Sequence, residues 1–110
     1  MEVQTILSAS GPLPLSETFT PVEDGPVVFL VTATAWSVSA PNQIGIEVYL
    51  NGESIGSTTL FANLNEVHMT LPTVLLTGTI SSVGPQKITI SPLTGTVSDY
   101  NDTYVVQILT

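Results

Sequence analysis

Oxygen-bearing side chains gather in one short segment near the end of the chain. Residues 95–102 read GTVSDYND and include Asp99, Asn101 and Asp102. Calcium takes six to eight oxygen ligands from carboxylates, amides and carbonyls, so these three residues are the candidate metal ligands and calcium is the candidate ion. A second segment or subunit has to complete the shell, because this loop offers too few acids. The interpretation that we favour requires no cofactor: the Asp and Asn side chains cap their own backbone in Asx turns.

The only histidine of the chain, His68, follows Glu66 by two positions. Residues two apart share one face of a strand, so a Glu–His pair here is able to orient a base or hold a metal. One histidine without a spaced partner gives no zinc signature, and we therefore expect a hydrogen-bonded or solvent-facing side chain at a strand start. The remaining alternative is a trimer in which three copies of His68 meet at a symmetry axis.

Aromatic side chains supply the candidates for stacking on a sugar ring. Trp36 is the only tryptophan, and Tyr49 or Tyr100 is its candidate neighbour. These side chains combine a large apolar ring with a polar tip, which suits a surface ligand. The alternative for Trp36 is packing at the end of the fold, since large aromatics are mostly buried. The predicted ligand-binding residues are Trp36, Tyr49, Tyr100 and Asn101.

The residues that catalysis usually needs are missing. Cysteine and arginine are absent, and His68 is the sole histidine. Nucleophilic hydrolysis needs a Ser or Cys beside a histidine base and an orienting acid, and no spacing in this chain assembles that set. The spacing of the glutamates picks out no carboxylate pair for glycoside hydrolysis. We therefore expect a protein that is not an enzyme.

Charge composition restricts the partners and the location. The formal net charge is −8, and Lys87 is the only basic residue. Phosphate contacts depend on Lys and Arg, so nucleic acid is excluded as a partner. The longest apolar run, residues 27–31, is too short for membrane insertion. No basic or apolar signal region follows Met1, so we expect no classical signal peptide, and the hydroxyl-rich composition favours an extracellular or particle-associated protein such as one on a virion or appendage.

Alternation with period two and many β-branched residues predict an all-β protein. Eight strands are expected, at residues 2–8, 17–20, 26–37, 44–50, 54–62, 67–76, 87–91 and 103–109. The Asn51-Gly52 dipeptide suits a type I′ hairpin, and Pro72 predicts a bulge or an edge. Short strands at this spacing favour one antiparallel two-sheet sandwich of jelly-roll topology over residues 1–110.

Several motifs resemble those of known proteins. The strand end TAWS at 34–37, the hairpin IGIEVYLNG at 44–52 and the final SDYND resemble a group of small leaderless bacterial and phage-type β-jelly-roll proteins. The architecture also resembles the tumour-necrosis-factor and C1q type, which implies a homotrimer. The run DYND at 99–102 resembles the calcium loop of small bacterial sugar-binding lectins, which implies that Asp99, Asn101 and Asp102 ligate a calcium ion that holds a sugar. The lectin loop has further acids upstream, where this chain has Gly95, Thr96 and Val97.

Two functions remain open at this point. The first is a non-enzymatic binding module that recognises carbohydrate or another surface ligand through loops at one end of the sandwich and acts as an oligomer. The alternative is a structural subunit of a virion, tail or cell-surface appendage that assembles as a homotrimer. Edge strands in a chain with one lysine lack charged gatekeepers, which indicates that another subunit covers them.

Overall fold

The computed structural model describes residues 2–110. Met1 lies outside that range; it is the first residue of the predicted domain and of the segment that was considered for a signal peptide. Within it the chain forms ten strands: β1 (Val3–Ser10), β2 (Leu15–Phe19), β3 (Gly25–Ser37), β4 (Asn42–Leu50), β5 (Glu53–Ala62), β6 (Met69–Thr70), β7 (Val74–Ile80), β8 (Gln86–Pro92), β9 (Thr96–Val97) and β10 (Thr103–Leu109). Over the same residues we find no helix with the length and apolarity that a bilayer crossing needs.

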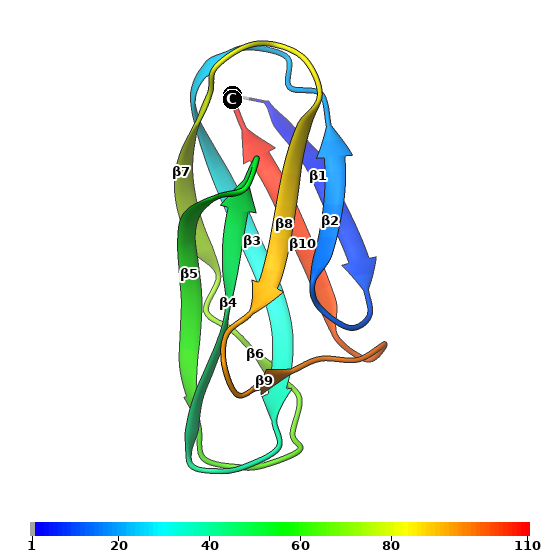
Figure 1. Cartoon of the computed structure of the whole chain (residues 1–110), viewed down its shortest axis with the longest axis vertical. Helices are drawn as coiled ribbons and strands as arrows, with labels where there is room; N and C mark the ends of the chain where they lie inside the picture. Colours follow the sequence, from blue (N-terminus) through cyan, green and yellow to red (C-terminus); the bar gives the residue numbers. More distant parts are fainter. Residues whose placement is uncertain (1) are drawn as a thin grey trace.

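The eight longer strands form two antiparallel sheets that pack face to face (Figure 1). One sheet has the order β1-β10-β3-β7, and the other has the order β2-β8-β4-β5. Apart from the β4–β5 hairpin, consecutive long strands alternate between the sheets, which is the jelly-roll arrangement. The predicted all-β sandwich is therefore confirmed, with two additional strands of two residues each, β6 and β9.

Two predicted segments differ from the structure in detail. The strand expected at 67–76 is divided into β6 and β7, and β7 continues to Ile80. Pro72 lies at the break because proline has no amide hydrogen to donate to a sheet. The segment between the strands expected at 87–91 and 103–109 contains a further strand, β9, which pairs with the end of β3.

Strand β3 is thirteen residues long and determines where the loops meet. Its first part pairs with β10 on one side and with β7 on the other. Its last four residues extend beyond both: Thr34 and Ala35 pair with β6, and Trp36 and Ser37 pair with β9. The loops that precede β6 and follow β9 are consequently brought to opposite sides of the same strand end.

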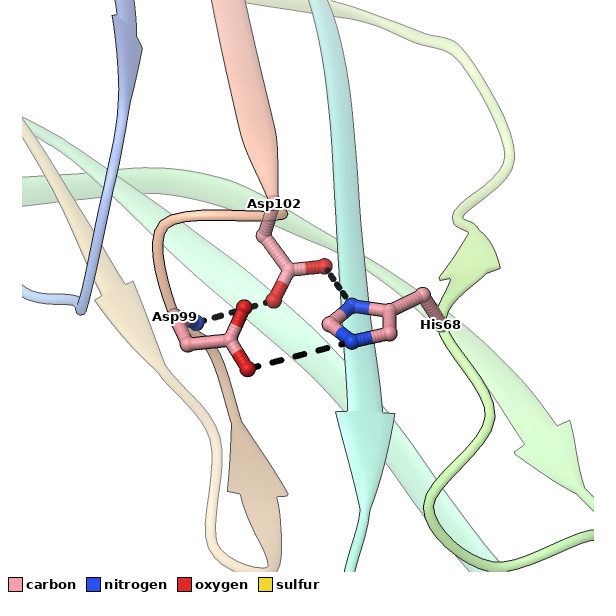
Figure 2. A group of neighbouring side chains, drawn as sticks. All are labelled: His68, Asp99 and Asp102. Carbon is pink, nitrogen blue, oxygen red and sulfur yellow. Dashed lines mark hydrogen bonds and ion pairs between the residues drawn. The ribbon is translucent and has the colours of Figure 1, made fainter.

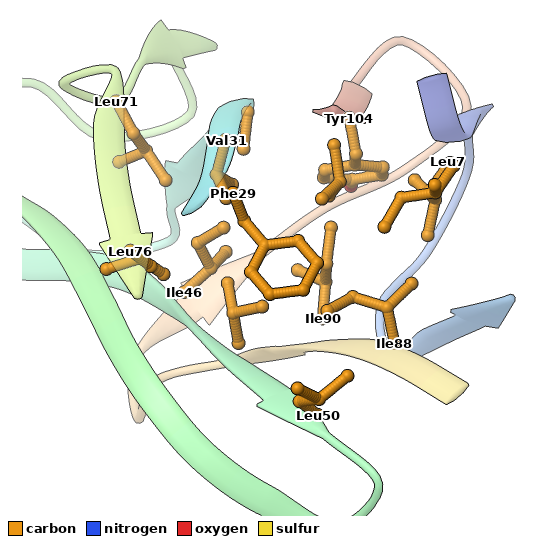
Figure 3. Close-up of a cluster of buried hydrophobic side chains, with 14 of the residues drawn as sticks. Leu7, Phe29, Val31, Ile46, Leu50, Leu71, Leu76, Ile88, Ile90 and Tyr104 are labelled. Atoms are coloured by element: carbon orange, nitrogen blue, oxygen red, sulfur yellow. The ribbon is translucent and has the colours of Figure 1, made fainter. Parts of the chain in front are cut away.

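The core fills the space between the sheets (Figure 3). Alternate residues of β3, including Phe29 and Val31, point inward and are fully buried, as are Ile46, Ile88 and Ile90 from the opposite sheet. Each such side chain contributes about 1.5–3 kcal/mol through burial. Because β3 alternates with period two, its other residues point outward, away from this core.

The phenol of Tyr104 is fully buried at one side of this core, and its hydroxyl donates a hydrogen bond to the Gly11 carbonyl at 2.8 Å. A buried hydroxyl without a partner would be costly, so this bond ties the β1–β2 connection to β10. The loop that precedes Tyr104 is therefore anchored at its end.

Candidate functional site

Polar side chains from two loops meet on the outward face of β3, near its end (Figure 2). The loop between β5 and β6 supplies His68, the loop between β9 and β10 supplies Asp99 and Asp102, and β3 itself supplies Thr34. We call these four residues the distal cluster. Trp36, two residues along the same face of β3, lies beside it, with its ring centroid 5.9 Å from that of His68.

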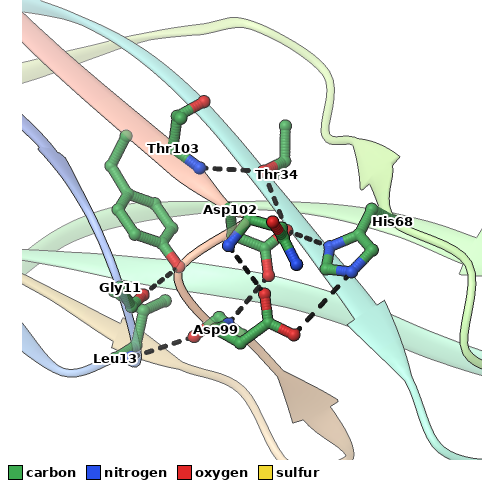
Figure 4. A network of polar contacts seen from close by, with 10 residues as sticks. Gly11, Leu13, Thr34, His68, Asp99, Asp102 and Thr103 are labelled. Atoms are coloured by element: carbon green, nitrogen blue, oxygen red, sulfur yellow. Dashed lines mark hydrogen bonds and ion pairs between the residues drawn. The ribbon is translucent and has the colours of Figure 1, made fainter.

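The carboxylate of Asp102 is fully buried and accepts three hydrogen bonds (Figure 4). Its Oδ1 accepts from Thr34 Oγ1 at 2.9 Å and from His68 Nδ1 at 2.7 Å, and its Oδ2 accepts from the Asp99 amide at 2.9 Å. A buried carboxylate needs such partners to offset its loss of hydration. Because an ionised carboxylate only accepts, the proton on the imidazole lies on Nδ1.

The second ring nitrogen of His68 faces a different carboxylate. Nε2 lies 3.8 Å from Asp99 Oδ2, which is too long for a hydrogen bond. The two side chains are 37% and 41% exposed, so this pair of atoms lies at the surface. The hydrogen bond with Asp102 raises the pKa of His68 above its ordinary value of 6.5, and the charges of Asp102 and Asp99 add to the rise against an opposing effect of desolvation.

The loop around Tyr100 contains the Asx turn that the sequence favoured. The amide of Asn101 donates to Asp99 Oδ1 at 2.8 Å, two residues back. Asn101 itself is exposed, and Tyr100 is 78% exposed, with its ring over the backbone of Gly11. The structure thus brings Asp99 and Asp102 together with His68 and leaves Asn101 at the solvent-exposed side of the turn.

Trp36 and Tyr49 lie on opposite outer surfaces of the sandwich and do not share a site. Trp36 is half-buried on the outward face of β3, and its Nε1–H is buried without a hydrogen-bond partner among the residues described. Tyr49 is half-buried on the outward face of β4, in the other sheet. There it pairs with Ser54 of β5 and with Thr89 of β8. Their separation follows from the topology, because each sheet turns its alternate residues away from the common core.

The sequence did not predict the partners of His68. Glu66 and His68 were expected to share a strand face, but β6 begins only at Met69, and Glu66 has a backbone φ of 60°. The partner of His68 is instead Asp102, 34 residues later in the chain. No local signal encodes that pair; it depends on the two loops flanking the same end of β3.

Surface hollows lie away from the distal cluster. One of about 450 Å³ is lined by residues such as Asn51, Glu53 and Thr79, and another of about 340 Å³ lies between β1 and β2. Neither is lined by residues of the cluster. Within the cluster, His68 and Asp99 reach solvent while Asp102 is buried beneath them, so a molecule bound there contacts the first two side chains from the surface.

The cluster presents one oriented imidazole and two carboxylates. The Asp102–His68 pair orients an imidazole as a general base requires, but within residues 2–110 no hydroxyl is hydrogen-bonded to Nε2, and the group facing it is another carboxylate. His68, Asp99 and Asp102 each offer an atom that can hold a metal ion, and these atoms lie within 4.8 Å of one another. The cluster thus combines hydrogen-bonding groups with the donor atoms of a metal site.

Comparison with known proteins places the fold. No protein-family model and no curated protein matches the sequence. A similar solved structure is the CBM36-1 domain of a multidomain xylanase from the hindgut metagenome of Trinervitermes trinervoides, with a TM-score of 0.50 and 14% identity over 100% of this chain and 86% of that one. The chain has a CBM36-like fold. At this level of identity the likeness shows the fold alone.

A second similar structure, the carbohydrate-binding module CBM36 in complex with calcium and xylotriose, has a TM-score of 0.43 and 15% identity over 99% of this chain and 87% of that one. This similarity is weaker than that to the CBM36-1 domain. The CBM36-like fold lends no support to the resemblance to the tumour-necrosis-factor or C1q type, to the phage-type grouping or to the homotrimer. These three stay predictions.

Proposed function

We propose that this protein is a non-enzymatic carbohydrate-binding module that binds a glycan on the open surface formed by the distal cluster and Trp36. The observation that carries the proposal is the position of a half-buried tryptophan ring beside an imidazole and a carboxylate that both reach solvent. A sugar ring has apolar C–H faces and hydroxyl groups that donate and accept hydrogen bonds. The tryptophan ring can pack against the apolar C–H face of the sugar, and the imidazole and the carboxylate can form hydrogen bonds with its hydroxyl groups.

The CBM36-like fold supports the same class of ligand. The similar structure is a domain whose name marks it as a carbohydrate-binding module of a xylanase. On a rigid jelly roll, end loops carry the variable contacts, and both loops of the distal cluster are of this kind. Xylan fragments are accordingly the first probes to use.

Calcium is the ion that the lectin resemblance predicts, through Asp99, Asn101 and Asp102. Both oxygens of Asp102 already accept hydrogen bonds from the protein, and Asp99 Oδ1 accepts from the Asn101 amide. Calcium prefers six to eight oxygen ligands, whereas the cluster adds an imidazole nitrogen. As folded, this donor set does not match a calcium shell, and calcium binding stays a prediction for titration.

A glycan array that includes xylan fragments, probed with and without chelator, tests the proposal. We expect the wild-type protein to bind at least one glycan, and Asp99→Asn to weaken that binding at least tenfold because it removes the exposed charge of the cluster. Tyr49→Ala is the matched control, since Tyr49 lies on the opposite surface. Absence of any glycan binding by the wild-type protein would contradict the proposal, and so would an equal loss in the Tyr49→Ala control.

The structural-subunit alternative retains one supporting observation. Several large apolar side chains are more than half exposed, among them Phe61, Leu64 and Leu75. Side chains of this kind are suited to contact with another subunit where they adjoin one another in a patch. The homotrimer, a particle partner and an extracellular or particle-associated location therefore stay predictions, and a mass measurement by light scattering tests the first: a monomer at micromolar concentration contradicts it.

A further inference from the structure

We propose that His68 Nε2 and Asp99 Oδ2 bind a borderline divalent cation of the Zn²⁺ class, with Asp102 acting as the positioning carboxylate of His68. The site uses the same surface as the proposed glycan, but the inference does not depend on a glycan being bound. It departs from the calcium loop, because its donors are one imidazole nitrogen and one carboxylate. Asn101 has no part in it.

The hydrogen bond of His68 leaves the correct nitrogen free. Nδ1–H donates to Asp102 Oδ1 at 2.7 Å, so the neutral ring carries its lone pair on Nε2. Histidines that bind metals in proteins almost always donate their other N–H to a carboxylate or carbonyl in this way. The carboxylate is itself fixed by Thr34 Oγ1 and by the Asp99 amide.

The distance between the two proposed donor atoms also suits a shared ion. Nε2 and Oδ2 are 3.8 Å apart. Two ligands at about 2.1 Å from a tetrahedral ion lie roughly 3.4 Å apart, so closure needs a movement of a few tenths of an ångström in two exposed side chains. Because both side chains reach solvent, water completes the coordination.

The chemistry of the donors selects the class of ion. Imidazole nitrogen suits zinc, copper, iron and nickel, whereas calcium and magnesium prefer oxygen ligands. The charge around the site favours a cation: Asp99 and Asp102 are both acidic, and the only lysine, Lys87, lies on β8 in the other sheet. The electrostatic potential at the site is therefore negative, and a nitrogen donor atom faces solvent.

Calorimetric titration of the chelator-stripped protein with Zn²⁺, in the absence of any glycan, tests the inference. We expect one Zn²⁺ per chain, at least tenfold weaker binding of Ca²⁺, and at least a tenfold loss of Zn²⁺ affinity in His68→Ala and in Asp99→Ala. Glu66→Gln is the matched control, since Glu66 is an exposed acid two residues from His68, and this variant should keep the wild-type affinity.

The positioning role of Asp102 needs a separate readout. Imidazole ¹⁵N resonances should show a protonated Nδ1 in the neutral ring and a shift of Nε2 on addition of Zn²⁺. Removal of such an orienting partner typically costs about 10–100-fold in metal affinity, and we expect a loss of that size in Asp102→Asn together with a mixture of ring tautomers. If that variant fails to fold, Thr34→Val provides the test, because it removes a donor to the same carboxylate oxygen.

Several outcomes would overturn the inference: no heat with Zn²⁺ at millimolar concentration, unchanged affinity in His68→Ala, tighter binding of Ca²⁺ than of Zn²⁺, or equal loss in Glu66→Gln. Its failure is distinguishable from that of the proposed function. Glycan binding in chelator without any Zn²⁺ heat contradicts only the metal site. Zn²⁺ binding by a protein that retains no glycan contradicts only the carbohydrate function.

Discussion

Two polar networks occupy opposite ends of this sandwich, and they differ in how many of their hydrogen-bonding atoms remain free. At the β4–β5 hairpin, Asn51 donates to Gln86 Oε1 at 2.6 Å and accepts from the Lys87 amide at 2.9 Å. Gln86 in turn uses both amide hydrogens, on the carbonyls of Ser82 and Gly84. The side chains of this network carry no charge, and their hydrogen-bonding capacity is largely used within the protein.

In the distal cluster, only the buried carboxylate of Asp102 has its hydrogen-bonding capacity largely used within the protein. Asp102 is enclosed by its donors, but His68 Nε2 and Asp99 Oδ2 face each other without a hydrogen bond. The two networks thus differ in free hydrogen-bonding capacity on exposed atoms, which is the property on which the proposed binding surface rests. The hollow of about 450 Å³ lies at the saturated end, beside Asn51.

The largest effect on stability is expected at the hairpin. Asn51 has a φ of 52°, a conformation that asparagine tolerates better than alanine. Asn51→Ala should lower the free energy of unfolding by about 2–4 kcal/mol through strain and two lost hydrogen bonds, whereas Asn51→Gly should lose only about 1–2 kcal/mol. Urea denaturation measures both. Equal losses in the two variants would remove strain from the explanation, and weaker Zn²⁺ binding in Asn51→Gly would contradict the division between the two ends.

A smaller loss of stability is expected at the buried carboxylate of the distal cluster. Asp102→Asn keeps an oxygen acceptor but loses the charge, and it should lower the free energy of unfolding by about 1–3 kcal/mol. Asp99→Asn, at a side chain that is 41% exposed, should cost less than about 1 kcal/mol. Thermal melts of the two variants compare them directly, and a larger loss in Asp99→Asn would show that the buried carboxylate is not the structural centre of the cluster.

The smallest effect is expected in the pH dependence of stability. The pKa of His68 is raised in the folded protein, first by its hydrogen bond with Asp102, so the folded state favours the protonated ring. The stabilisation is complete below the unfolded value of 6.5 and is lost as pH rises through the folded pKa. In chelator, the difference in melting temperature between the wild type and His68→Gln should be larger at pH 5 than at pH 8. A difference that does not change with pH would contradict the ion pair.

Features with local causes could be predicted from the sequence. The Asn51-Gly52 turn and the long apolar β3 each depend on residues adjacent in the chain, and both are present. Pro72 was expected to mark a bulge or an edge within one strand, and it lies instead where that strand is divided into β6 and β7. The Asx turn at Asn101 is of the same kind. Local backbone preferences and period-two alternation are properties of short segments, and they were sufficient to predict the sandwich.

Contacts across the fold were not predictable in the same way. The bond between Thr34 and Asp102 joins residues 68 positions apart, and it requires β3 to extend beyond the strands beside it. The separation of Trp36 from Tyr49 likewise depends on which sheet each strand joins. Polarity and spacing indicated the DYND loop but not the imidazole that faces it, because register and strand order are set by the whole core.

Binding of the wild type, Asp99→Asn and Asn51→Gly to the strongest glycan of the array tests the central claim most directly. The variants alter one end of the sandwich each: Asn51→Gly removes the side chain that accepts from the Lys87 amide, and Asp99→Asn removes the charge of the side chain that accepts from the Asn101 amide. We expect Asp99→Asn to lose at least tenfold in affinity and Asn51→Gly to bind as the wild type does. Equal binding by all three proteins, or a loss confined to Asn51→Gly, would contradict the assignment of ligand binding to the distal cluster.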